Sequence, residues 1–124
     1  MAIESMAVVG AGQMGSGIAQ VAAQAGLQVV LADASPDLAR RAHDKLAGAL
    51  SRLVEKGKLA AGERAAVLGR IRPAASLEDC AGADLAIEAI VEDQRVKVEL
   101  LRRLDGLLRP EALLASNTSS ISIT

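Results

Sequence analysis

The chain contains no phenylalanine, tyrosine or tryptophan among its 124 residues. Proteins that bind single-stranded nucleic acid stack its bases on aromatic side chains, so this chain lacks the usual platform for that function. The formal net charge is −1, which gives no overall attraction to nucleic acid or to an anionic membrane surface. We therefore predict neither a nucleic-acid partner nor a membrane partner.

Cysteine and histidine are also scarce, with one of each, Cys80 and His43. A single cysteine excludes an internal disulfide and suits a reducing compartment, so we expect a cytoplasmic protein. The opening residues carry no basic side chain before Gly10 interrupts the first apolar stretch, and we expect no signal peptide or bilayer span. His43 stands among charged residues of a predicted helix, where we interpret it as a solvated side chain. We predict no metal site.

A chain of this length fits one domain and can bury roughly two-thirds of its surface. Short apolar runs alternate with helical patterns, which predicts a Rossmann-type α/β fold: a doubly wound parallel sheet with right-handed crossovers. Ser35 and Pro36 are typical of a helix start, and Gly57 of its end, so a long helix pair follows the second strand. Pro73 places its strand near an edge, and residues 76–79 have a capping-box pattern. The expected strands are 6–9, 28–32, 70–74, 84–90 and 113–116, and the main helices are 13–25, 36–56, 62–69 and 93–108.

The segment Gly-Ala-Gly-Gln-Met-Gly at residues 10–15 lies between the first strand and the first helix. In this context the spacing is the dinucleotide-binding fingerprint. Gly10 permits a tight turn, Gly12 lets a pyrophosphate approach the backbone, and Gly15 lets the helix lie close to the strand. The helix then begins with Gln13 and Met14. Its N-terminus offers unpaired N–H groups and the positive end of the helix dipole to phosphates.

Asp33 ends the second strand, eighteen positions after Gly15. This is close to the usual spacing of the acid that accepts hydrogen bonds from the adenosine ribose. A carboxylate there would repel a 2′-phosphate, and the next two residues, Ala34 and Ser35, supply no arginine to receive one, so NAD is favoured over NADP. The adenine ring would have to lie between aliphatic groups. The alternative is that Asp33 only ends a strand and begins a turn.

Three blocks of the sequence together resemble the N-terminal domain of the 3-hydroxyacyl-CoA dehydrogenases, over essentially the whole chain. They are residues 8–20 around the glycine fingerprint, residues 87–93 (Ile-Glu-Ala-Ile-Val-Glu-Asp) and residues 115–120 (Ala-Ser-Asn-Thr-Ser-Ser). The resemblance implies an NAD-dependent oxidoreductase that converts a 3-hydroxyacyl-CoA to the 3-ketoacyl-CoA in fatty acid or related acyl-CoA metabolism.

The resemblance also implies residue roles. Glu92 and Lys97 match positions that reach the nicotinamide-side ribose. The alternative is a surface pair of Asp93 with Lys97 at i,i+4 and a carboxylate that favours the helix dipole. Ser119 matches the serine between nicotinamide and substrate, and Asn117 a neighbour in the same cleft; alternatively, both belong to a Ser/Thr-rich turn.

Lys56 falls at the tip of the predicted helix pair, where the family binds the coenzyme A nucleotide. The alternative is a cation placed at a helix C-terminus. The family often has a serine one or two turns earlier, and Ala49 stands at the nearest position here.

The family's catalytic histidine and its partner glutamate lie beyond the serine motif, in sequence that this chain does not contain. We therefore expect residues 1–124 to be a truncated NAD-binding domain, inactive alone, whose full-length form dimerises through a missing C-terminal helical domain. Two alternatives are an NAD-dependent dehydrogenase of a related hydroxy acid and a non-catalytic NAD(H)-sensing module.

Overall fold

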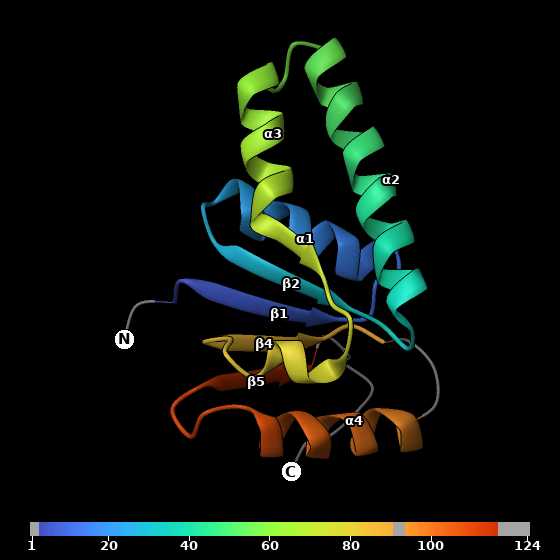
Figure 1. The fold of residues 1–124 in the computed structure, drawn as a ribbon, viewed down its shortest axis with the longest axis vertical. Helices are drawn as coiled ribbons and strands as arrows, with labels where there is room; N and C mark the ends of the chain where they lie inside the picture. The colour runs from blue at the N-terminus through green and yellow to red at the C-terminus, as the bar shows by residue number, and fades with distance from the viewer. Residues whose placement is uncertain (1–2, 91–93, 117–124) are drawn as a thin grey trace.

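The computed structural model describes residues 3–90 and 94–116, and within them five parallel strands pair in the order β3-β2-β1-β4-β5 (Figure 1). The chain builds the sheet outward from β1 in one direction and then returns to add β4 and β5 on the other side. This reversal of strand order between β1 and β4 is the switch point of a doubly wound sheet, so the predicted fold is confirmed. The strands are β1 (Ser5–Val9), β2 (Gln28–Ala32), β3 (Ile71–Pro73), β4 (Leu85–Glu88) and β5 (Leu113–Ser116).

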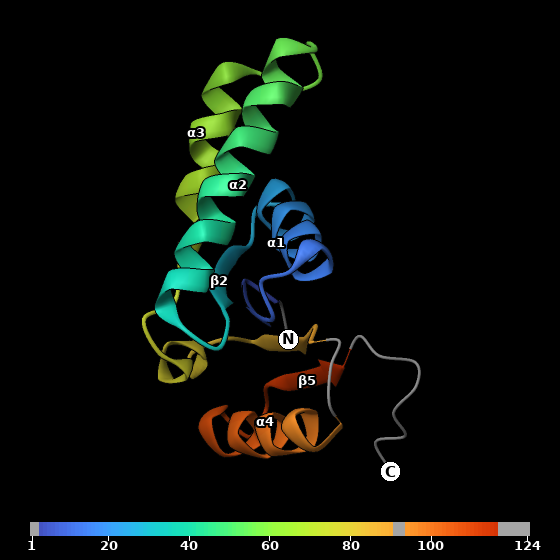
Figure 2. The same ribbon diagram turned by 90° about the vertical axis from the view of Figure 1, so that its right-hand side faces the viewer.

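The helices cover the two faces of the sheet unequally (Figure 2). Three helices, α1 (Gln13–Gln24), α2 (Pro36–Glu55) and α3 (Ala61–Arg70), lie on one face. The other face carries α4 (Gln94–Leu107) and the short 3-10 helix η1 (Leu77–Cys80). None of the described helices is both long and apolar enough to cross a membrane.

The alternation of side chains along β1 divides the interior into two cores. Met6 and Val8 join the core under α1, α2 and α3, whereas Ala7 and Val9 join the core under α4. The second core consists mainly of small residues and includes Cys80, and burial raises the pKa of the Cys80 thiol to about 11.

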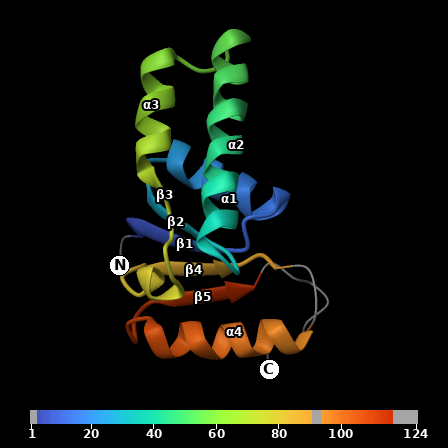
Figure 3. The same ribbon diagram turned by 45° about the vertical axis from the view of Figure 1, so that its right-hand side comes forward.

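The helix pair α2–α3 extends past the sheet (Figure 3). Ser35 caps α2 by accepting a hydrogen bond from the Leu38 N–H, and Pro36 is the first helical residue, as predicted. Gly57 adopts a φ of +72° just after the helix, which confirms the expected stop. The side chain of Arg64 on α3 donates to the Ser51 hydroxyl on α2 over 2.8 Å and joins the two helices.

Two local predictions differ from the structure. The capping box at residues 76–79 is wrong in detail: Ser76 makes no side-chain cap, and the Asp79 carboxylate instead accepts from the Ala75 N–H over 2.8 Å. Strand β4 ends at Glu88, two residues before the predicted end. The Ile90 N–H donates a hydrogen bond to the Glu88 carboxylate and not to a neighbouring strand, so strand pairing ends there.

Asp84 joins three segments at the amino ends of the strands. Its carboxylate accepts hydrogen bonds from the N–H groups of Glu4 and Ser5, and it forms an ion pair with Arg109. These partners, the Glu4 N–H most of all, hold the pKa of the Asp84 carboxyl below its ordinary value of 3.8.

We expect Asp84→Asn to lower the melting temperature at neutral pH. A carboxyl whose folded pKa is depressed stabilises the fold above its unfolded pKa, 3.8, and this contribution is lost as the pH falls through the folded pKa. The difference between wild type and variant should therefore shrink in acid, as measured by circular dichroism melts across pH. Glu111→Gln, which removes the exposed second partner of Arg109, is the control and should change little. A decrease in the melting temperature of Asp84→Asn that is equal at all pH values would contradict this account.

Candidate coenzyme-binding site

The turn after β1 is wedged between the neighbouring strands. Gly10 has a φ of +116°, which L residues rarely adopt, and its N–H donates to the Ala32 carbonyl over 2.8 Å. A Cβ on Gly10 would lie 2.8 Å from the carbonyl carbon of Ala89, just beyond β4. The structure therefore confirms that Gly10 is needed for the tight turn.

Gly15 sets how closely α1 approaches β1. A Cβ added to Gly15 would lie 1.6 Å from the Gly10 carbonyl oxygen, and 3.4 Å from the Val8 side chain. No side chain fits such a gap, so the predicted close packing of helix on strand is confirmed. Gly10 and Gly15 are thus both required by the fold itself.

Gly12 is different, because no described atom lies within 4 Å of the position its Cβ would occupy. Its backbone is extended, with φ −71° and ψ −170°, so the protein's own packing does not require a glycine. Gly12 is the N-cap of α1, and no described side chain caps that helix end. Gln13 and Met14, which follow it, are exposed. The first turn of α1 therefore presents bare backbone at its positive dipole end, which suits an anion.

The Asp33 carboxylate reaches from the end of β2 to the glycine turn. One oxygen accepts from the Ala11 N–H over 2.7 Å, and the other from the Ala34 N–H over 2.6 Å. The bond to Ala34 shows that Asp33 begins a turn after β2, which was the alternative interpretation from the sequence. The bond to Ala11 also joins Asp33 to the loop after β1. Asp33 is half-buried, so an acidic group stands beside the glycine turn.

A hollow of about 850 Å³ begins at Asp33 and runs across the carboxyl edge of the sheet to α4. Much of its wall is aliphatic. Sequence reasoning missed the α4 side of this wall. The signal was present, because the residues recur at helical spacing along one stripe of α4. They are Arg95, Val96, Glu99, Leu100 and Arg103.

Lys97 projects from α4 into the protein and is only 2% exposed. Its Nζ lies 3.8 Å from a carboxylate oxygen of Glu88, a residue that sequence reasoning did not single out. This burial excludes the alternative of a solvated surface pair for Lys97. Glu88 also accepts a hydrogen bond from the Ser116 hydroxyl over 2.6 Å, at the end of β5. The ends of β4 and β5 are therefore tied to α4 by a buried polar cluster.

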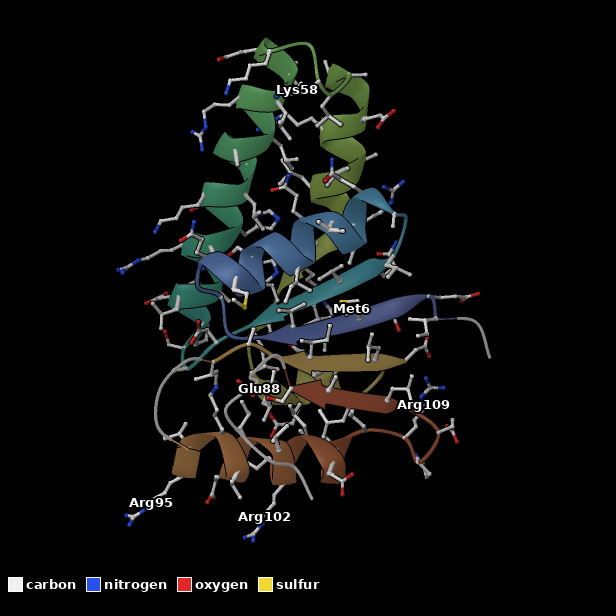
Figure 4. All side chains as sticks on the ribbon, turned by 180° about the vertical axis from the view of Figure 1, so that it is seen from behind. Met6, Lys58, Glu88, Arg95, Arg102 and Arg109 are labelled. Atoms are coloured by element: carbon white, nitrogen blue, oxygen red, sulfur yellow. The ribbon has the colours of Figure 1, made fainter. Side chains whose placement is uncertain are left out.

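The remaining predicted site residues lie elsewhere. Glu92, Asn117 and Ser119 fall outside the described residues, so their predicted roles stay predictions. Lys56 is exposed at the C-cap of α2, near the tip of the helix pair that Lys58 marks in Figure 4, away from the sheet. His43 is half-buried, with its Nε2 3.5 Å from the Leu68 carbonyl of α3, so it is less solvated than predicted.

Comparison with known proteins places this geometry in a family. Residues 5–124 match the family described as 3-hydroxyacyl-CoA dehydrogenase, NAD binding domain. A probable 3-hydroxybutyryl-CoA dehydrogenase of Deinococcus radiodurans is 50% identical over 117 residues, which cover 94% of this chain and 42% of the relative. The chain thus spans less than half the length of that relative.

Solved structures agree. The crystal structure of 3-hydroxybutyryl-CoA dehydrogenase from Escherichia coli superimposes with a TM-score of 0.94 at 43% identity, covering 100% of this chain and 26% of that one. A pyridine-carboxylic acid dehydrogenase, described as an NAD+-dependent dismutase, is 36% identical with a TM-score of 0.79, covering 99% and 39%. This chain belongs to the 3-hydroxyacyl-CoA dehydrogenase family and corresponds to its NAD-binding domain.

Proposed function

We propose that this chain binds NAD as the coenzyme-binding part of a dehydrogenase that oxidises a 3-hydroxyacyl-CoA to the 3-ketoacyl-CoA. The observation that carries the proposal is the open space at Gly12, beside two glycines that the fold itself requires. A position that needs no glycine for packing, at an uncapped helix N-terminus, fits a pyrophosphate lying against the backbone. Family membership supports the coenzyme, and the names of the relatives support the substrate class.

In this proposal the two halves of NAD lie on either side of β1. The pyrophosphate lies on Gly12 and the first turn of α1, which begins with Gln13 and Met14. Asp33 accepts hydrogen bonds from the adenosine ribose, since a carboxylate has about four lone-pair positions and two of its bonds are already made. The aliphatic hollow receives the adenine. The same carboxylate would repel a 2′-phosphate, which favours NAD over NADP.

The other half of NAD then extends over the ends of β4 and β5. Lys97 and Glu92 contact the nicotinamide-side ribose, while Ser119 and Asn117 line the substrate cleft. When bound, the nicotinamide ring accepts the hydride from C3 of the hydroxyacyl group. A hydroxyl and an amide beside that path donate to the substrate oxygen without adding charge. The base that takes the hydroxyl proton belongs, by the family resemblance, to residues outside these 124.

Coenzyme A is the proposed ligand of the α2–α3 tip. Lys56 and Lys58 are both exposed there, and an ammonium suits a phosphate as a point charge. Lys56 also stands at the C-cap of α2, so its charge serves the helix dipole in either case. Dimerisation through a further helical domain, the domain boundary at 1–124 and a cytoplasmic location stay predictions.

A second candidate function is NAD-dependent oxidation of a substrate that carries no coenzyme A, such as a related hydroxy acid. The NAD+-dependent pyridine-carboxylic acid dehydrogenase shares the fold of nearly the whole chain at 36% identity, which favours this alternative over a non-catalytic sensor. A protection experiment distinguishes the two candidate functions. Acetoacetyl-CoA or free coenzyme A should protect Lys56 from acylation by an amine-reactive reagent only if the α2–α3 tip binds coenzyme A.

We expect Gly12→Ala to fold and to lose coenzyme affinity. The methyl group meets no described atom, so stability should fall by no more than about 1 kcal/mol, the usual cost of alanine at an N-cap. NADH binding, measured by fluorescence titration, should weaken by roughly tenfold or more, equivalent to ~1.4 kcal/mol, because the methyl group occupies the pyrophosphate position.

Two matched variants complete this test. Gly15→Ala should cost about 3 kcal/mol or more, because its methyl group overlaps the Gly10 carbonyl. Gly17→Ala, on the same helix in open space, should bind NADH normally and gain about 0.5–1 kcal/mol. Wild-type NADH affinity in Gly12→Ala would contradict the proposed placement of the pyrophosphate.

We also expect the 124-residue chain to bind NADH but to reduce acetoacetyl-CoA at no measurable rate. Binding is measured by isothermal titration calorimetry, and reduction by the loss of NADH absorbance. NADPH should bind more weakly than NADH because of Asp33. Full turnover by this chain would show that the catalytic base lies within it, and the absence of NADH binding would overturn the proposed function.

A further inference from the structure

The Glu88 carboxylate is fully buried where α4 meets the ends of β4 and β5 (Figure 4). One of its oxygens accepts from the Ser116 hydroxyl over 2.6 Å, and the other accepts from the Ile90 N–H. That second oxygen is also 3.8 Å from the Lys97 ammonium. The carboxylate therefore contacts the residues after β4, the end of β5 and α4 at once.

Among the described residues, Glu88 and Lys97 are the charged side chains that are buried. Removing two ions from water carries a penalty that their mutual attraction often fails to offset, so an apolar pair would serve stability as well or better. Stability alone therefore does not explain why this ion pair is buried. Removing one partner would still destabilise the protein, because a buried lysine without its counter-ion is strongly disfavoured.

The pair lies beside the proposed coenzyme site. Glu88 pairs with Val9 across the ladder, and the next residue, Ala89, packs directly against Gly10. Asp33 is on β2, on the opposite side of β1. A dinucleotide with its adenosine at Asp33 and its phosphates at Gly12 must extend over β4 and β5.

We propose that Glu88 is a positioning residue that holds the Lys97 ammonium at the nicotinamide-side ribose. This inference rests on the proposed function, in which Lys97 contacts that ribose. In this proposal Glu88 acts through Lys97 and not on the coenzyme directly: its carboxylate bonds the Ser116 hydroxyl and the Ile90 N–H, and it lies 3.8 Å from the Lys97 ammonium. Glu88 pairs with Lys97 and also accepts a hydrogen bond from Ser116, the residue before Asn117, which is predicted to line the substrate cleft.

The test compares two ligands on the 124-residue chain. NADH carries the nicotinamide ribose, whereas ADP carries only the adenosine and the two phosphates. Glu88→Gln keeps the size of the side chain and removes its charge. We expect it to weaken NADH binding by roughly tenfold and to leave ADP binding unchanged, a selectivity that general loosening of the fold would not give. Asp105→Asn, which removes an exposed carboxylate from the same helix, is the matched control and should leave both affinities unchanged.

A double-mutant cycle tests whether Glu88 acts through Lys97. In a Lys97→Met background, Glu88→Gln should weaken NADH binding no further, because the group that it positions is already absent. Equal losses in the two backgrounds would overturn the proposal. Equal losses of NADH and ADP affinity in Glu88→Gln would overturn it as well.

Glu88→Asp covers the case in which Glu88→Gln does not fold. Aspartate keeps the charge opposite Lys97 but shortens the side chain by one methylene, so the selective loss of NADH affinity should persist. Wild-type NADH affinity in a folded Glu88→Asp would then overturn the proposal. If the wild-type chain binds neither ligand, both the proposed function and this inference are overturned. If the wild-type chain binds NADH and a folded Glu88 variant binds it with the same affinity, only this inference is overturned.

Discussion

The approach of α1 to the turn after β1 is the constraint on which the rest of the site depends. The Gly10 carbonyl lies where a side chain on Gly15 would have to be, so helix and strand meet backbone to backbone. That contact aims the first turn of α1 at the carboxyl edge of the sheet. With any larger residue the helix would move outward, and the bare N–H groups at its start would no longer face the switch point between β1 and β4.

The same edge collects charge in two different ways. Asp33 is half-buried, and its carboxylate accepts hydrogen bonds from two backbone N–H groups. Glu88 is fully buried and balances a buried lysine. In the proposed function, Asp33 contacts the coenzyme and Glu88 holds the lysine that contacts it. Parallel strands make this division possible because all their carboxyl ends lie along one line.

Local patterns predicted most of the fold. The alternation of strands and helices, the edge position of β3, the helix pair and the roles of Gly10 and Gly15 all follow from short-range rules, and the structure confirms them. The role of Glu88 could not be predicted this way, because its partners, Ser116 and Lys97, come from β5 and α4. The capping box at Ser76 failed for a related reason: the pattern predicts which groups can pair, but the tighter turn of η1 moves Asp79 to a different N–H.

The α2–α3 pair has a consequence for how the molecule moves. Near the sheet these helices share the large core under α1, but towards the tip they are joined mainly to each other, through contacts such as Arg64 with Ser51. Segments held by few partners open locally at low free energy while the remainder stays folded. Amide hydrogens should therefore exchange with solvent progressively faster from the base of the pair to Gly57.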